Sequence, residues 1–139
     1  MLKAFLMLLL AVVSTSAAAA WFDIGGDKTT TVYADPATIR REGNIAQMWH
    51  LLDFKTARIA PGPKRYRYLS SKSHNEYDCD LQLTRVLLRT WYSGHMGKGY
   101  VVYRSHKHGR WEPVPPESAA ELLWRTACEQ IVIARRQRF

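Results

Sequence analysis

Hydrophobic and polar residues alternate along most of the chain, and this pattern predicts a series of β-strands followed by one helix. Runs rich in β-branched and aromatic residues, which strands favour, are separated by breaks that contain glycine or proline. The longest run covers residues 82–92, where strict alternation would place Arg85, Arg89 and Trp91 on one face. The predicted strands span residues 21–24, 30–33, 45–54, 66–73, 82–92 and 100–104, with a short extended piece that starts at Trp111.

Two segments carry helical signals. Pro36 follows Asp35, a residue suited to capping, and the pattern predicts one helical turn over residues 36–40. Near the C-terminus, Ser118 and Glu121 have the spacing of a capping box. The helix after them would bury one face, formed by Trp124, Ala127, Cys128 and Ile131. We therefore predict an α+β fold, with an antiparallel sheet of about five to six strands and one C-terminal helix packed on a face.

The first 20 residues have the pattern of a secretory signal peptide. Lys3 precedes an apolar run over residues 4–13, and small residues lead to Ala20. The run is shorter than the roughly 20 residues that cross a bilayer, and no later stretch is a candidate membrane helix. We expect cleavage after Ala20, export to the periplasm or the outer surface, and one domain over residues 21–139.

The chain has two cysteines, Cys79 and Cys128. In an oxidising compartment such a pair predicts a disulfide, and two separate thiols are the alternative. The bond would close a loop of roughly 50 residues and contribute on the order of 4 kcal/mol to stability. It would also join the C-terminal helix to the sheet.

Basic residues outnumber acidic ones, 20 to 12, and give the chain a formal net charge of +8. Several are interleaved with tyrosine and tryptophan, an arrangement that suits polyanions. Inside a cell nucleic acid would be the first expected partner, but export favours an acidic polysaccharide, lipopolysaccharide phosphate or an acidic protein surface instead. For most of the basic residues a solvated surface is the simpler interpretation. The candidate contact residues are Lys64, Arg65, Arg67, Arg85, Arg89 and Trp91.

Metal binding has weaker support in the sequence. Glu76, Asp78 and Asp80 would share one side of an extended strand. Calcium usually takes six or more oxygen ligands, so a solvated strand edge is the simpler interpretation. His106 and His108 would both reach one metal from an extended segment, but no third ligand is evident from spacing and an exposed turn is favoured.

Haem binding and catalysis are weaker still. His95 beside Met96 suggests haem or copper ligation, although a pair in a glycine-rich loop is weak evidence. The chain has no Gly-x-Ser-x-Gly elbow, and a disulfide would remove Cys79 as a nucleophile. The sequence predicts neither an enzyme nor a bound cofactor.

Fragments spread over nearly all of residues 21–139, taken in order, resemble the surface-adhesin protein E family. They are Trp21, Val32–Pro36, Met48–Phe54, Tyr77–Cys79, Met96–Gly99, Trp111 and Ala127–Cys128. The resemblance implies an antiparallel sheet with a packed C-terminal helix and an exported envelope protein of Gram-negative type. It also implies binding to host extracellular proteins. One departure is that no cysteine near the cleavage point is available to carry a lipid anchor.

Three hypotheses follow. The leading one is a non-catalytic binding domain of the cell envelope that contacts extracellular proteins or polyanions through its basic and aromatic residues. The alternative is a periplasmic structural or accessory module that acts through a protein partner or as a homodimer. A third is a metal or haem binder that uses His95, His106 and His108.

Overall fold

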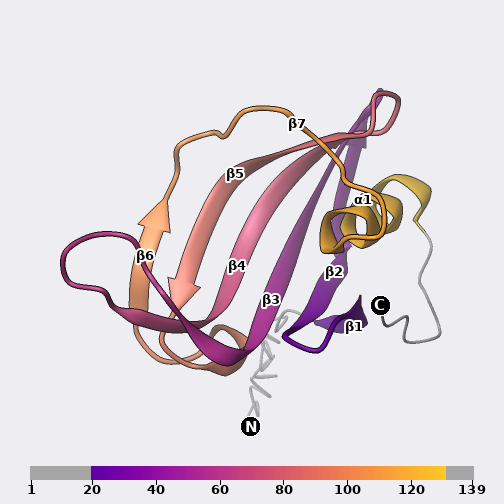
Figure 1. The fold of residues 1–139 in the computed structure, drawn as a ribbon. Coiled ribbons are helices and arrows are strands. Elements are labelled where there is room, and N and C mark those ends of the chain that lie inside the picture. Colours follow the sequence, from indigo (N-terminus) through magenta and orange to yellow (C-terminus); the bar gives the residue numbers. More distant parts are fainter. Residues whose placement is uncertain (1–19, 131–139) are drawn as a thin grey trace, which may run out of the picture.

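The computed structural model describes residues 20–130, which form one antiparallel sheet and one α-helix. The strands β1 to β6 lie in sequence order across the sheet, and the short β7 pairs with β5 beside β6. Figure 1 shows a curved sheet with the helix α1 against one face. The elements are β1 (Phe22–Gly26), β2 (Thr30–Glu42), β3 (Ile45–Ile59), β4 (Arg67–Asp78), β5 (Leu83–Tyr92), the 3₁₀ turn η1 (His95–Gly97), β6 (Val101–Ser105), β7 (Glu112–Pro113) and α1 (Ala119–Glu129).

The predicted fold class is confirmed. Each pair of neighbouring strands is antiparallel, and the one described α-helix follows the last strand. Within residues 20–130, no helix combines the length and the apolar character needed to cross a membrane. The predicted signal peptide lies outside the described residues except for Ala20, and Ile131 also lies outside them.

The helix packs against what we call the inner face of the sheet. Apolar side chains of β1 to β4 meet one stripe of α1, which removes them from water and stabilises the contact. This main core consists of Ile24, Val32, Ala34, Ala46, Met48, Tyr77, Leu122, Leu123, Trp124 and Ala127. A second cluster lies on the same face, around Phe54, Ala60 and Tyr68.

The start of α1 matches its predicted cap. The Ser118 side chain accepts a hydrogen bond from the backbone N–H of Glu121, at 3.2 Å. The Glu121 carboxylate accepts one from the backbone N–H of Glu117, one residue earlier than a capping box requires. The bond to Ser118 satisfies a backbone N–H that the first turn leaves without an intrahelical partner, and the bond from Glu117 fixes the residue before the cap.

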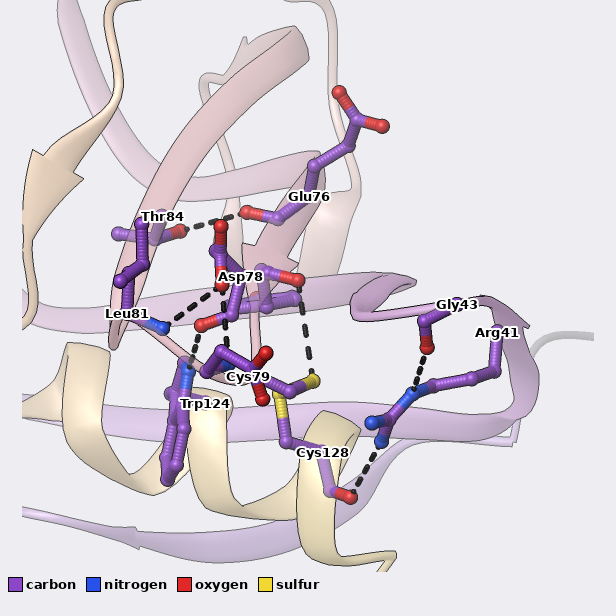
Figure 2. The surroundings of a disulfide bond; sticks show 11 residues. Arg41, Gly43, Glu76, Asp78, Cys79, Leu81, Thr84, Trp124 and Cys128 are labelled. Carbon is purple, nitrogen blue, oxygen red and sulfur yellow. Dashed lines mark hydrogen bonds between the residues drawn. A yellow bond between two sulfur atoms is a disulfide. The ribbon is translucent and has the colours of Figure 1, made fainter.

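The predicted disulfide between Cys79 and Cys128 is present, with Cα atoms 5.5 Å apart. Figure 2 shows it between the end of β4 and the last turn of α1. The indole N–H of Trp124 donates to the carbonyl oxygen of Asp78 at 2.9 Å, and the Arg41 guanidinium donates to the carbonyl oxygen of Cys128 at 3.0 Å. The helix is therefore attached to the sheet by a covalent bond and by two hydrogen bonds beside it.

The predicted helical turn at residues 36–40 is wrong, because β2 continues through this segment to Glu42. Pairing with β3 is interrupted between Asp35 and Arg40, and Thr38 fills the gap. Its hydroxyl donates to the carbonyl oxygen of Asp35 at 2.7 Å and accepts the backbone N–H of Trp49 at 3.0 Å. The proline thus marks an irregularity in a strand, where its missing N–H breaks no ladder bond.

Candidate binding site

A cavity of about 600 Å³ lies on the inner face, between α1 and the edge of the sheet. Its lining includes His50 of β3, Asn75 and Tyr77 of β4, and Arg89 and Trp91 of β5. Leu123 of α1 borders it on the other side. The cavity therefore lies where the sheet leaves the cover of the helix, and its size is typical of sites for small ligands.

Three buried polar atoms of this lining have no hydrogen-bond partner. They are Nδ1 of His50, Oδ1 of Asn75 and the hydroxyl of Tyr77, whose residues are 5%, 8% and 1% exposed. In residues 20–130 only one other buried side-chain atom shares this state, Oδ1 of Asp35. Buried polar groups are normally paired, so their concentration at one cavity is a feature to explain.

Burial also controls the ionisation of these groups. The pKa of His50 is lowered to about 3, chiefly by desolvation and also by the nearby charges of Arg89 and His74. Desolvation likewise raises the pKa of Tyr77. His50 and Tyr77 are thus neutral at physiological pH and act as hydrogen-bonding groups rather than as charges.

A bulge in β5 decides which basic residues face the cavity. Successive residues His74 and Asn75 of β4 pair with Leu88 and Val86, so Leu87 is an extra residue in β5. Along β5, the side chains that point to the inner face change at the bulge from even-numbered to odd-numbered residues. The prediction that Arg85, Arg89 and Trp91 share one face is therefore wrong.

Arg89 and Trp91 pair with Ser73 and Ser71 on the inner face, whereas Arg85 pairs with Glu76. The Arg85 guanidinium is bound by the Glu76 carboxylate, with Nε 2.7 Å from Oε1, and lies over the ring of Trp111. Arg85 borders the cavity, but its charge is already paired.

The segment between β6 and β7 supplies the rim. The backbone N–H of Gly109 donates to the carbonyl oxygen of Val86 at 2.8 Å, which holds this segment beside β5. The exposed residues Lys107 and Arg110 border the cavity from this segment, and the exposed Glu112 borders it from β7. Within residues 20–130, no carboxylate forms an ion pair with Arg89, Lys107 or Arg110.

A cluster of aromatic side chains forms the wall of the cavity that lies farthest from α1. The ring of Trp91 stacks on Tyr68 with centroids 4.4 Å apart, and Tyr103 lies against its other side at 4.6 Å. Phe54 meets Tyr68 edge-on. Trp91 and Tyr103 line the cavity.

The other predicted contact residues lie elsewhere. Lys64 and Arg65 are exposed in the connection from β3 to β4, and Arg67 is exposed at the first position of β4. Figure 1 shows this connection as a long loop that projects from the sheet. Of the loop, only Pro61 borders the cavity. The six predicted residues therefore form two separate basic regions.

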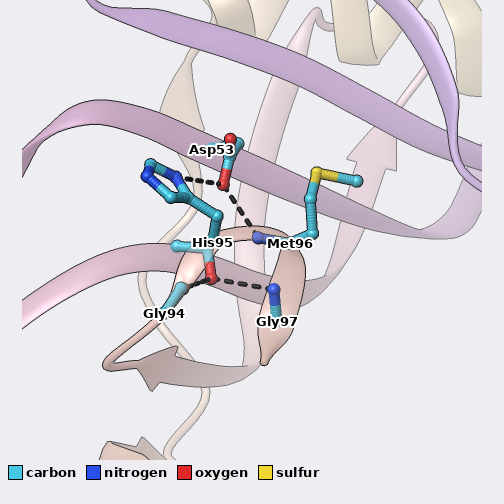
Figure 3. A network of polar contacts seen from close by, with 6 residues as sticks. Asp53, Gly94, His95, Met96 and Gly97 are labelled. Carbon is cyan, nitrogen blue, oxygen red and sulfur yellow. Dashed lines mark hydrogen bonds and ion pairs between the residues drawn. The ribbon is translucent and has the colours of Figure 1, made fainter. Parts of the chain in front are cut away.

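His95 and Met96, the pair considered as weak evidence for haem or copper, are held by the protein's own groups. Figure 3 shows the Asp53 carboxylate against η1, where it contacts Nδ1 of His95 at 3.2 Å and accepts the backbone N–H of Met96 at 2.8 Å. Ser70 accepts the backbone N–H of Gly97 and donates to the carbonyl oxygen of Gly94. These hydrogen bonds explain the conformation of residues 94–97 without a bound metal or haem.

The acidic residues considered for calcium, for which a solvated strand edge was the simpler interpretation, have partners within the protein. Glu76 is bound by Arg85 and by Gln47, and Oδ1 of Asp78 accepts the backbone N–H groups of Asp80 and Leu81. In the described part of the chain, no three His, Cys, Asp or Glu side chains gather as ligands of a metal would. His106 and His108 therefore have no third ligand of this kind beside them among the described residues.

The cavity residues of β3 and β4 were not predicted from sequence. The pattern carried a signal, since Ser71, Ser73, Asn75 and Tyr77 recur at every second position, as strand residues on one face do. A polar face that turns out to be buried is unusual and indicates a site. The sequence did not show that this face is the inner one, because that depends on which face the helix covers.

A second hollow, of about 540 Å³, lies on the opposite face of the sheet and is bordered by Trp21, Asp35, Trp49 and Lys72. The ring of Trp49 stacks on His74 at 5.0 Å, and Lys72 lies over Tyr92. We call this the outer face.

Comparison with known proteins agrees with the fold. Residues 21–129 match the family described as surface-adhesin protein E. A crystal structure of Haemophilus influenzae protein E, crystal form II, is 14% identical, with a TM-score of 0.55 over 71% of this chain and 80% of that one.

Protein E from non-typeable Haemophilus influenzae is 12% identical, with a TM-score of 0.54 over 83% of this chain and 79% of that one. At such identities the likeness is one of fold. No curated protein matches the chain significantly. Because the family match covers all the described strands and the helix, the chain belongs to the surface-adhesin protein E family, a family of adhesin-like surface proteins.

Proposed function

We propose that this protein is an exported, non-catalytic binding domain of the cell envelope. It contacts extracellular proteins or polyanions through basic and aromatic side chains. The carrying observation is a group of cationic residues at one end of the inner face, Arg89, Lys107 and Arg110, with no ion pair to any residue of 20–130. Cations left without local partners suit an anionic partner that arrives from outside.

The basic loop between β3 and β4 adds a second contact region. Lys64, Arg65 and Arg67 are exposed to solvent. Dissolved salt therefore weakens the electrostatic attraction between their charges and a binding partner. Membership of a family of surface adhesins supports a role outside the cytoplasm. The arrangement requires no chemical step.

Salt-dependent binding tests this function. The full chain, expressed in a Gram-negative host and purified as that host processes it, is passed over immobilised heparin and immobilised fibronectin. We expect affinity for at least one probe to fall by about tenfold or more between low and high salt, because the contacts are electrostatic. Affinity that does not change with salt would contradict the mechanism.

A matched pair of variants locates the contact. Replacing Lys64, Arg65 and Arg67 by Gln should weaken binding several-fold. Replacing three other exposed basic residues, Lys28, Arg40 and Lys98, removes the same charge elsewhere and should have a smaller effect. Equal losses would show that only net charge matters.

A second candidate function is a partner-dependent or dimeric envelope module. β6 pairs with β5 on one side, and among the described strands nothing pairs with its other edge. Tyr100, Val101 and Tyr103 at this edge are 64%, 45% and 43% exposed. An edge strand with exposed apolar groups favours strand addition by another chain. Sedimentation of the purified chain tests this, since a strict monomer with no cross-linked envelope partner would contradict it.

A further inference from the structure

The cavity on the inner face presents a complementary set of unpaired hydrogen-bonding groups. The Tyr77 hydroxyl donates or accepts, Oδ1 of Asn75 accepts, and Nδ1 of neutral His50 does either according to its tautomer. All three belong to residues at least nine-tenths buried. A ligand rich in hydroxyl groups would satisfy each of them, because a hydroxyl both donates and accepts.

The lining of the same cavity includes a half-buried cation, Arg89. Arg89 lies across Ser73 from His50 in the sheet, and its charge is close enough to lower the pKa of that histidine. Its guanidinium has no partner within residues 20–130. A guanidinium in this state is suited to bidentate binding of a carboxylate. Lys107 and Arg110 add positive charge at the rim, against the single carboxylate of Glu112.

The wall supplies an apolar border. Trp91 and Tyr103 line the cavity, and the Trp91 ring is held in place between Tyr68 and Tyr103. Because these two rings cover the faces of Trp91, the cavity meets the edge of the Trp91 ring and part of Tyr103. The apolar C–H groups of a pyranose ring can pack against such a border.

We infer that the cavity binds an acidic sugar, a pyranose with one carboxylate. Arg89 binds the carboxylate, His50, Asn75 and Tyr77 bind the hydroxyl groups, and Trp91 and Tyr103 border the apolar part of the ring. The volume of about 600 Å³ is enough for one or two sugar units. This inference rests on the proposed binding function, of which it names the ligand class.

The test is calorimetric titration of the full chain, purified as the exporting host processes it, with three sugar acids and two neutral sugars. N-acetylneuraminic acid represents host glycans, 3-deoxy-manno-octulosonic acid represents bacterial lipopolysaccharide, and glucuronic acid occurs in both sources. Glucose and galactose are the neutral probes. We expect at least one acid to bind and both neutral sugars to bind at least tenfold more weakly. Failure of all three acids, or equal binding of the neutral sugars, would overturn the inference.

Variants connect the binding to the cavity. Arg89→Gln should weaken acid binding about tenfold or more and leave the weak binding of neutral sugars unchanged. Arg104→Gln is the matched control, because Arg104 lies on the outer face, where it borders the other hollow. If both variants weaken binding equally, the cavity is not the site.

Tyr77→Phe separates a ligand role from a structural one. Its hydroxyl has no hydrogen-bond partner among residues 20–130, so removing it should not lower stability but should weaken sugar binding several-fold. Unchanged affinity in this variant would overturn the role assigned to Tyr77 and with it the position of the sugar.

The two proposals fail in different ways. Salt-sensitive binding to heparin or fibronectin without any binding of sugar acids keeps the proposed function and overturns the sugar site. Binding of a sugar acid without binding of either macromolecule supports the cavity site and contradicts the wider surface role.

Discussion

His50 is a basic side chain that the fold keeps uncharged. It is buried on the inner face of β3, and its pKa is lowered to about 3, chiefly by desolvation. Single residues of this kind are hard to find in a sequence, since an isolated histidine in a strand is equally compatible with a core position or a surface one. Its role became visible only beside Asn75, Tyr77 and Arg89.

This histidine predicts loss of stability in acid. In the unfolded chain His50 titrates near pH 6.5, whereas in the folded protein it stays neutral down to about pH 3. Its contribution is thus complete above pH 6.5 and is lost as the pH falls toward 3, because only the unfolded chain takes up the proton. At pH 5 this loss amounts to about 2 kcal/mol.

Urea unfolding between pH 7 and pH 5 measures this effect, and His50→Gln should make the free energy of unfolding less dependent on pH. His74 adds a smaller slope of the same sign, since desolvation lowers its pKa as well. A slope that is the same in His50→Gln and in the unaltered protein would contradict the assignment.

Thr38 gives the second prediction at this scale. Its hydroxyl accepts the Trp49 N–H where the pairing of β2 with β3 is interrupted. Thr38→Val keeps the shape but leaves that N–H without a partner, so the free energy of unfolding should fall by about 1–3 kcal/mol. Thr38→Ser keeps the hydroxyl and should lose clearly less. Denaturant unfolding of the two variants tests this, and equal losses would show that the methyl group matters instead.

At the scale of elements, the sequence predicted the regular features and missed the irregular ones. The strand runs, the Ser118 cap and the cysteine pair are local signals, and each has its counterpart in the structure. The residues around Leu87 do not indicate a bulge in the sequence. The bulge is defined by the register between β4 and β5, in which Leu87 has no partner. That one residue separated Arg85 from Arg89 and Trp91.

The link between β4 and α1 predicts a large stabilisation. The cysteines are 49 residues apart, and a closed loop of that length contributes about 4 kcal/mol by restricting the unfolded chain. Replacing both cysteines by Ser should lower the free energy of unfolding by about that amount. Unfolding of the unaltered protein with reductant should reproduce the loss, while the double variant should not respond to reductant.

At the scale of the whole molecule, the cavity depends on segments far apart in the chain. Its floor comes from β3 and β4, its cation from β5, its rim from the segment before β7 and one border from α1. The sequence predicted a basic and aromatic surface, and three of its residues, Arg85, Arg89 and Trp91, border the cavity. The rest of the site follows from strand order and from the face chosen by the helix, which residue patterns do not specify.

The position of the helix also sets the order in which an exported chain can mature. Ile24 of the first strand and Ala127 of the last helix belong to one cluster, so the core closes only when both are on the same side of the membrane. A chain that emerges N-terminus first exposes Cys79 long before its partner arrives. The bond between Cys79 and Cys128 can therefore form only after α1 has arrived beside the end of β4.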